Sequence, residues 1–189
     1  LSHQGRISPI RFLLYVIAQT AGAFVGSALC FAVYYDAINA FDGGVRQVTG
    51  NQSTAGIFAT YPQAYMSVPG ACLDQALGAA LLCLCIGSII DRRNQIPLYL
   101  QPPFVGIIVT LIGMTLAMNC GGAINPARDF GPRLLTLAVG YGWEVIEYND
   151  YSWFWIPLVC PFIGAVCGAW LYEFFIGFHM PDDLEDALA

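Results

Sequence analysis

Four long stretches of apolar residues limit what this chain can fold into more than any other feature. Each is about as long as the ~20 residues that a helix needs to cross the ~30 Å hydrocarbon layer of a membrane. The first of them carries no charged residue. The stretches are residues 13–35, 72–90, 102–119 and 153–178. The pattern therefore predicts an all-α membrane protein with four spanning helices.

The composition excludes several other classes of protein. Hydrophobic residues make up 57% and charged residues 11% of the chain, against ~25% charged in soluble domains. The net charge of −6 provides no basic surface for nucleic acid. The seven cysteines are scattered without a Cys-x-x-Cys pair, so neither a metal site nor a disulfide framework is expected. Since the chain also lacks a cofactor loop and a nucleophile paired with a base, we expect no cofactor and no enzyme activity.

Between the third and fourth stretches, residues 121–133 read Gly-Gly-Ala-Ile-Asn-Pro-Ala-Arg-Asp-Phe-Gly-Pro-Arg. Asn125 is a good N-cap, and Pro126 suits the first position of a helix. A helix over residues 126–139 would be roughly 20 Å long, too short to cross the membrane. Irregular backbone and an arginine such as Arg128 are tolerated at membrane depth only inside protein or beside a polar pathway. The pattern fits a re-entrant half-helix, and equally a surface loop followed by a capped helix.

Residues 125–133 resemble the second Asn-Pro-Ala signature of the aquaporin family. They are most similar to the aquaglyceroporin branch, where an aspartate follows the arginine and a basic residue closes the motif. Residues 54–62, Thr-Ala-Gly-Ile-Phe-Ala-Thr-Tyr-Pro, resemble an outer loop of the same branch. The resemblance implies an inverted-repeat bundle whose first Asn-Pro-Ala half lies outside this chain. The implied parts are a cytoplasmic entry with the last helix of the first repeat (1–35), an extracellular loop (36–71), the second repeat (72–178) and a cytoplasmic tail (179–189).

The resemblance also assigns roles to individual residues around a pore. Asn125, in the motif with Pro126 and Ala127, would offer its side-chain amide to a passing hydroxyl group. Arg128 would donate hydrogen bonds at the narrowest, outer constriction. Gln75 matches a position where the family has a carboxylate that accepts backbone N–H groups from the loop. The carbonyl groups that would line one wall, on an extended path, are those of Cys120, Gly121, Gly122 and Ala123.

Several positions distinguish a solute channel from a water-selective one. Gly113 matches a small filter residue that replaces the histidine of water-selective members. The other concordant positions are Asp129, Arg133, Pro157 and Leu158. Gly122 departs from the pattern, because many glycerol channels carry an aromatic residue there. The absence of an aromatic ring at this position predicts a wider filter.

The resemblance therefore implies a passive channel for glycerol, small neutral solutes such as urea, and water. Two alternatives stay open: a water-selective aquaporin, which Gly113 and Asp129 oppose, and a non-conducting scaffold or adhesion protein of the same fold. The expected partners are the permeants and membrane lipid. The resemblance also implies that further copies of the same protein assemble with it in a homotetramer.

Arginine positions predict the orientation of the chain. Arg6, Arg11, Arg92 and Arg93 flank one side of the predicted spans, whereas the opposite loops hold only Arg46 outside the half-helix motif. By the positive-inside rule both ends of the chain are cytoplasmic, in a multi-pass protein that we expect in the plasma membrane. The glycosylation sequon at Asn51 then lies outside, as its use requires. Trp153 and Trp155 are expected in an interfacial aromatic belt.

Overall fold

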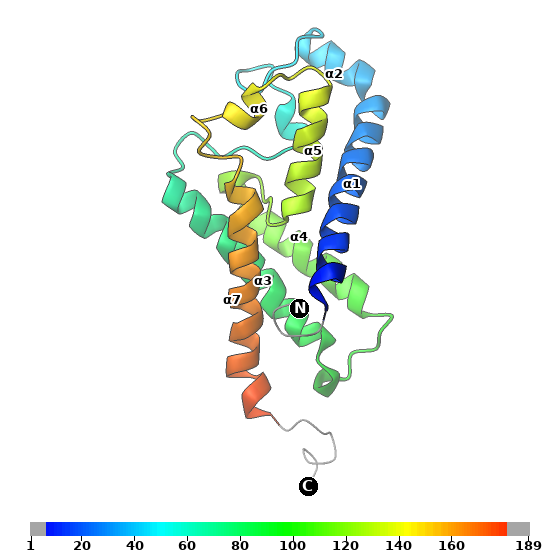
Figure 1. Cartoon of the computed structure of the whole chain (residues 1–189), viewed down its shortest axis with the longest axis vertical. Helices are drawn as coiled ribbons and strands as arrows, with labels where there is room; N and C mark the ends of the chain where they lie inside the picture. Colours follow the sequence, from blue (N-terminus) through cyan, green and yellow to red (C-terminus); the bar gives the residue numbers. More distant parts are fainter. Residues whose placement is uncertain (1–6, 181–189) are drawn as a thin grey trace.

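The computed structural model describes residues 7–180, which form helices and connections without a strand (Figure 1). Four helices are long and apolar enough to span a membrane. They are α1 (Pro9–Val33), α3 (Val68–Ile90), α4 (Gln101–Cys120) and α7 (Ile156–Phe175). The shorter elements are α2 (Tyr35–Asp42), α5 (Pro126–Ala138), α6 (Glu144–Glu147) and the 3₁₀ turns η1 (Ala55–Ile57), η2 (Arg92–Asn94) and η3 (Gly177–His179). The predicted fold class is confirmed; Arg6 and the tail from residue 181 lie outside the described residues.

Polar caps, rather than the edges of the apolar stretches, fix where two spanning helices begin. Helix α1 begins at Pro9, before the predicted residue 13, because the Ser8 side chain accepts the Arg11 N–H at 3.4 Å. Helix α3 likewise begins at Val68 rather than residue 72, because Ser67 accepts the Gly70 N–H at 3.2 Å. A serine followed by proline within the first helical turn marks both starts.

Helices α3 and α7 pack through their backbones in a contact that we call the seam. A Cβ atom added to Gly164 would lie 1.9 Å from the Ala76 carbonyl oxygen, and one added to Gly168 would lie 2.0 Å from that of Ala80. The two contacts have the same separation in sequence, so the helices run in the same direction (Figure 1). Lipid supplies no hydrophobic driving force between helices, so their association depends on close packing. Small residues such as these glycines and alanines permit that close packing.

The outer cap is the second packed region, and it comprises α2, residues 43–67, the end of α5 and residues 139–147, which include α6. These parts gather at the end of the molecule where α1 and α5 finish (Figure 1). Residues from each part form one buried cluster: Ile38, Val48, Ala55, Phe58, Leu135, Tyr141 and Val145. The region predicted as a polar loop therefore contains a helix and its own small core.

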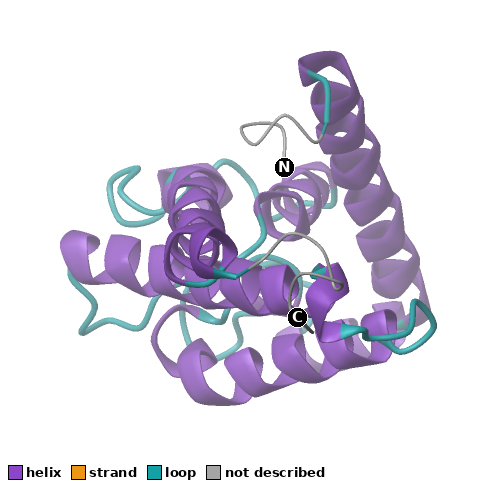
Figure 2. Ribbon diagram, turned by 90° about the horizontal axis from the view of Figure 1, so that it is seen from below, coloured by secondary structure: helices purple, strands orange, loops and turns teal. Residues whose placement is uncertain are grey.

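Helix α5 packs along α1 (Figure 1), and the view from below shows only helices and loops among the described residues (Figure 2). A Cβ atom on Gly131 of α5 would lie 2.7 Å from the Thr20 carbonyl oxygen of α1, so these helices also touch through their backbones.

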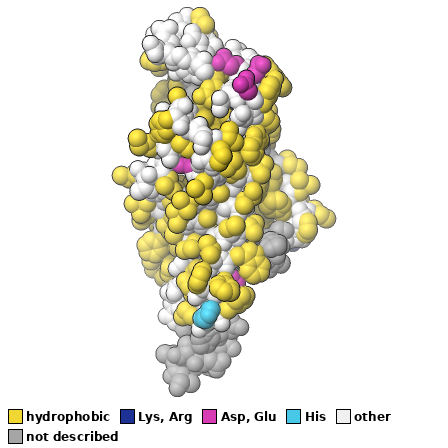
Figure 3. All heavy atoms as spheres, turned by 90° about the vertical axis from the view of Figure 1, so that its left-hand side faces the viewer, with side chains coloured by type: hydrophobic (Ala, Val, Ile, Leu, Met, Phe, Trp, Pro, Cys, Tyr) yellow, Lys and Arg dark blue, Asp and Glu magenta, His cyan; other side chains and the backbone are white. Residues whose placement is uncertain are grey.

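Hydrophobic side chains cover much of the face shown in Figure 3, between the two ends of the molecule. Helix α1 has no buried residue, and Met114 and Met118 of α4 are each 80% exposed. A surface this apolar suits contact with hydrocarbon or with other helices.

Candidate functional site

The site is built around the start of α5, where Asn125 acts as the N-cap. Its side-chain oxygen accepts the backbone N–H groups of Ala127 at 3.0 Å and Arg128 at 3.2 Å. Pro126 occupies the first turn, where its missing N–H costs least. Because the oxygen serves the cap, the amide NH₂ of the exposed Asn125 side chain is the group that faces outward to donate.

The loop before Asn125 has an unusual backbone. Gly121, Gly122 and Ile124 have φ angles of 73°, 63° and 36°. The backbone is therefore left-handed at the glycines rather than extended as predicted, a conformation that glycine adopts without strain. Cys120 and Ala123 are buried, whereas Gly121 is exposed and Gly122 is half-buried, so the four residues are not equally open.

Gln75 of α3 supports this loop from below. Its side-chain oxygen accepts the Ile124 N–H at 2.9 Å, and the residue is fully buried. Its amide nitrogen donates to Asp74 at 3.0 Å, and Asp74 also accepts the amide of Asn119 at 3.0 Å. The bond from the Ile124 N–H to Gln75 holds Ile124 in its strained conformation. A β-branched residue with a positive φ is a genuine outlier, so it needs such support.

The two arginines of α5 have opposite environments. Arg133 is fully buried and donates to Asp129 at 2.9 and 3.0 Å, to the Thr60 carbonyl at 2.7 Å and to the Val145 carbonyl at 2.7 Å. Arg128 is exposed, and its one bond to a described residue runs from Nη1 to the Phe58 carbonyl at 3.0 Å. Within residues 7–180 the remaining N–H groups of Arg128 have no acceptor, whereas Arg133 donates to several buried groups of the fold.

Asp129 joins α5 to the outer cap through Thr60. Its carboxylate accepts the Thr60 N–H at 2.8 Å and also the Thr60 hydroxyl. The Thr60 carbonyl accepts Trp153 Nε1 at 2.6 Å, and Trp153 is 1% exposed. The prediction that Trp153 belongs to an interfacial belt is therefore wrong, because its indole N–H has a partner in the interior.

Tyr61 packs against the Arg133 guanidinium, whose carbon lies 4.9 Å from the ring centre. Burial raises the pKa of Tyr61 to about 12. Its hydroxyl has no hydrogen-bond partner among the described residues, so the ring contributes as a flat face against the cation rather than as a proton donor.

A cavity of about 1340 Å³ extends from the start of α5 towards the far ends of α3 and α7. Its lining includes Asn125, Pro126, Ala127, Leu158, Asp91 and Arg93. Arg128 is not among the lining residues and is bonded to the outer cap instead. The lining therefore ends at Ala127, one residue before Arg128. The structure does not bring Gly113 or Pro157 to this cavity: Gly113 is half-buried on α4, and Pro157 is buried on α7.

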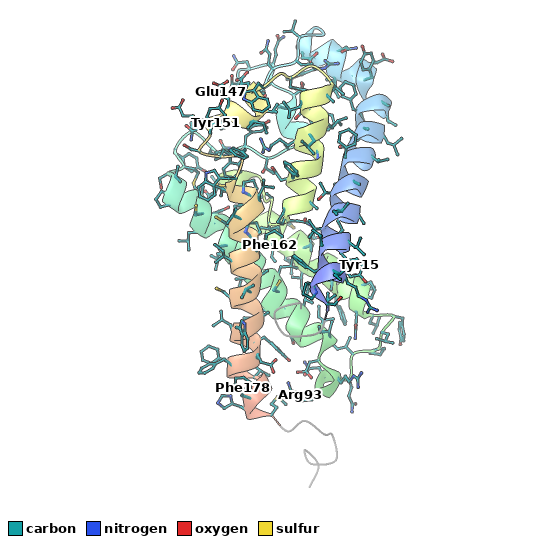
Figure 4. The ribbon with its side chains drawn as sticks, in the orientation of Figure 1. Tyr15, Arg93, Glu147, Tyr151, Phe162 and Phe178 are labelled. Atoms are coloured by element: carbon teal, nitrogen blue, oxygen red, sulfur yellow. The ribbon has the colours of Figure 1, made fainter. Side chains whose placement is uncertain are left out.

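The far end of the cavity is braced by polar contacts between α3 and α7. Arg93 donates to Asp91 at 2.7 Å and to the Gly177 carbonyl at 3.1 Å, beside the end of α7 (Figure 4). The Tyr172 hydroxyl donates to Asp91 at 2.6 Å. The Arg93 guanidinium holds the pKa of Asp91 well below its usual range, against the opposing effect of burial. Within residues 7–180 no cluster of His, Cys, Asp and Glu could hold a metal ion.

Membrane-length helices around a capped half-helix define the class of this protein, a multi-pass membrane protein of the aquaporin fold. The X-ray structure of the aquaglyceroporin from Plasmodium falciparum matches with a TM-score of 0.82 and 28% identity, over 93% of this chain and 69% of that one. Residues 1–172 match the model of the family described as major intrinsic protein. The chain belongs to the major intrinsic protein family, whose members are channels and not enzymes.

Individual relatives are also similar along most of the chain. Mouse aquaporin-9 is 46% identical over 93% of this chain and 59% of its own length. Human aquaporin-10 is 39% identical over 97% of this chain and 61% of its own length. Aquaporin-2 of Milnesium tardigradum is 46% identical over 92% and 54%. The chain therefore spans a little over half the length of these curated relatives.

Proposed function

We propose that the protein carrying this chain conducts glycerol, other small neutral solutes such as urea, and water passively across a membrane. The observation that carries the proposal is the environment of Arg128. It is exposed and tied by a single bond to Phe58, directly after the Asn125 cap. The names of the relatives, aquaporin and aquaglyceroporin, support the same function.

Asn125 and the start of α5 form the donor side of the proposed pathway. The amide NH₂ of Asn125 donates to a hydroxyl or carbonyl oxygen of the solute. The N-terminus of α5 carries a partial positive charge, which repels cations and orients water with its oxygen towards the helix. Of the loop formed by Cys120, Gly121, Gly122 and Ala123, the open carbonyls of Gly121 and Gly122 accept hydrogen bonds from the solute, and Gln75 fixes the path of the loop.

We further propose that Gly113 and Gly122 leave the filter wide. A Cβ atom added to Gly113 would meet no described atom within 4 Å. Gly122 carries no ring, although its φ of 63° and the 3.1 Å that would separate an added Cβ atom from that of Ala117 also give glycine a backbone role. Asp129, Arg133, Pro157 and Leu158 complete the signature of a solute channel.

The proposed setting is the plasma membrane, with both ends of the chain cytoplasmic and residues 36–71 outside. Supporting this, the connection with Asn51 and the turn η2 with Arg92 and Arg93 lie at opposite ends of the molecule (Figure 1). Asn51 is exposed, as a glycosylated asparagine must be. We propose a homotetramer surrounded by lipid, to which the apolar outer faces of the helices are suited.

Stopped-flow permeability of proteoliposomes containing the complete protein tests the proposal. A solute channel speeds the passage of water, glycerol and urea above the lipid background. Acceleration of water alone would assign a water-selective channel. No acceleration of any of the three, from protein shown to be folded and inserted, would assign a non-conducting scaffold.

A further inference from the structure

The outer cap contains an ion pair that the pathway described above does not use. Arg46 Nη1 donates to both oxygens of Asp42, at 2.8 and 2.6 Å, and Nη2 donates to Asn39 at 2.6 Å. The side chain of Arg46 is 8% exposed and that of Asp42 is 0% exposed. The Arg46 guanidinium also lies 5.2 Å from the Phe31 ring centre and 5.7 Å from that of Tyr35. Its charge is therefore compensated on every side, and Arg46 does not offer a free cation to a solute.

The ion pair is connected to the chain that precedes Phe58. The Thr54 hydroxyl donates to Asp42 at 3.0 Å and lies 2.7 Å from the Tyr141 hydroxyl. Because the single Thr54 proton goes to the carboxylate, Tyr141 is the donor in the second bond. Asp42, Thr54 and Tyr141 are 2%, 2% and 4% exposed. These three residues form a linear chain of hydrogen bonds, from Tyr141 through Thr54 to Asp42, which we call the outer strut.

The outer strut is close to the carbonyl that holds Arg128. Thr54 immediately precedes η1, whose turn bonds run from Ile57 N–H to the Thr54 carbonyl and from Phe58 N–H to the Ala55 carbonyl, both 3.1 Å. The Phe58 ring lies 6.5 Å from the ring of Tyr141, so the strut reaches Phe58 through both the backbone and a side chain. Phe58 is 4% exposed, and its carbonyl accepts Arg128 Nη1 at 3.0 Å.

We propose that Asp42, Thr54 and Tyr141 are positioning residues that fix the Phe58 carbonyl and, through it, the Arg128 guanidinium at the outer constriction. The inference rests on the proposed function. It predicts that solute selectivity depends on a buried network that no solute touches. The position of the Arg128 side chain depends on the position of its acceptor, the Phe58 carbonyl. Arg133 is held by Asp129 and by the Val145 and Thr60 carbonyls, so its position does not depend on the outer strut.

The test compares Thr54→Val, which removes the hydroxyl at nearly constant shape, with Thr54→Ser, which keeps it. Both are made in the complete protein, and permeability to water, glycerol and a five-carbon polyol is measured by stopped flow at matched amounts of folded protein. We expect Thr54→Val to raise the polyol-to-water ratio roughly two- to fivefold, the size of couplings transmitted between packed sites. Thr54→Ser should leave that ratio at the wild-type value. A merely structural role would lower all three permeabilities in proportion and leave the ratio unchanged, which would overturn the proposal.

A second comparison tests the route through Arg128. In an Arg128→Val background, Thr54→Val should change the ratio no further, because the group that the strut positions is gone; equal effects in both backgrounds would contradict the proposal. Should Thr54→Val fail to fold, Tyr141→Phe removes the other hydroxyl of the strut and is judged by the same ratio. The proposed function is judged separately, by glycerol passage through the wild-type protein.

Discussion

The seam and the outer cap hold the molecule together by different physical means. In the seam, glycines bring the backbones of α3 and α7 into contact, so the fit there depends on the shapes of the two helices. In the outer cap, buried charges such as Asp129 and Arg133 are matched by hydrogen bonds to side chains and to loop carbonyls. The difference follows from the two backbones. A helix satisfies its own N–H and C=O groups, and an irregular connection at a membrane protein's end needs partners supplied to it.

The comparison predicts which substitutions each region tolerates. Adding volume should damage the seam most, because it contains no flexible atom that can move aside. Removing one charge or one donor at constant shape should damage the outer cap most, because a buried group would lose its partner.

The largest effect is expected from Gly164→Val in the seam. The new side chain would place Cβ 1.9 Å from the Ala76 carbonyl oxygen and 2.6 Å from its carbon, so α3 and α7 would have to separate. We expect loss of folded protein, measured as the monodisperse fraction on size exclusion in detergent. Gly106→Ala is the control, because a Cβ atom there meets no described atom within 4 Å. Folded Gly164→Val protein at the wild-type yield would show that the seam is looser than described.

The next largest effect is expected from Asp129→Asn, at the contact between α5 and the outer cap. The substitution keeps the shape but leaves the buried Arg133 guanidinium without its countercharge, which costs about 3–5 kcal/mol. Thermal unfolding in detergent should show the loss, and a second change, Arg133→Met, should recover part of it. A loss below about 1 kcal/mol would mean that water or lipid headgroups reach Arg133.

A smaller effect is expected from Trp153→Phe. The change removes the indole N–H that donates to the Thr60 carbonyl at 2.6 Å, but the same carbonyl still accepts Arg133 Nη2 at 2.7 Å. Because the acceptor keeps a partner, the loss in stability should be about 1 kcal/mol. Thermal unfolding beside Asp129→Asn checks the order, and equal losses in the two variants would show that the indole ring itself is essential.

The smallest effect is expected from a change of pH from 7 to 5. Burial opposes ionisation of Asp42, but bonds from Arg46, Gly44 and Thr54 outweigh it and lower its pKa. A carboxylate whose folded pKa is depressed contributes stability above its unfolded pKa of about 3.9, and that contribution is lost only as the pH falls through the folded value. Burial raises the pKa of Tyr141 further above this range, so its hydroxyl does not titrate between pH 7 and 5. The polyol-to-water ratio should stay constant between pH 7 and 5, and a change would place the titrating group elsewhere.

The spanning helices and the half-helix could be predicted from the sequence because each is encoded locally. Apolar length identifies the spans, and Asn125 followed by Pro126 identifies the start of α5. The first turn of α1 was missed because Arg11 looked like the edge of the membrane, although a long cationic side chain at a helix end extends into the interface. The four-residue spacing of Asp42 and Arg46 was a local sign of an ion pair that the loop assignment left unused.

Contacts between distant residues could not be predicted in the same way. Thr60 and Trp153 meet only because the outer cap folds over α5, and nothing in either neighbourhood specifies the other. Only the resemblance to the family indicates that Gln75 supports the loop. Its bond to the Ile124 N–H depends on how α3 packs against that loop, which the local sequence does not specify.

The central claim is that Arg128 serves the solute while Arg133, five residues later, serves the fold. The most direct test is Arg128→Val in the complete protein, with thermal stability and stopped-flow permeability to water, glycerol and a five-carbon polyol measured on the same preparation. The account predicts a loss of stability of about 1 kcal/mol, as for one hydrogen bond, together with a raised polyol-to-water ratio and a weaker barrier to cations. If Arg128→Val were as unstable as Asp129→Asn and had the permeability ratios of the wild type, the claim that Arg128 serves the solute would be contradicted.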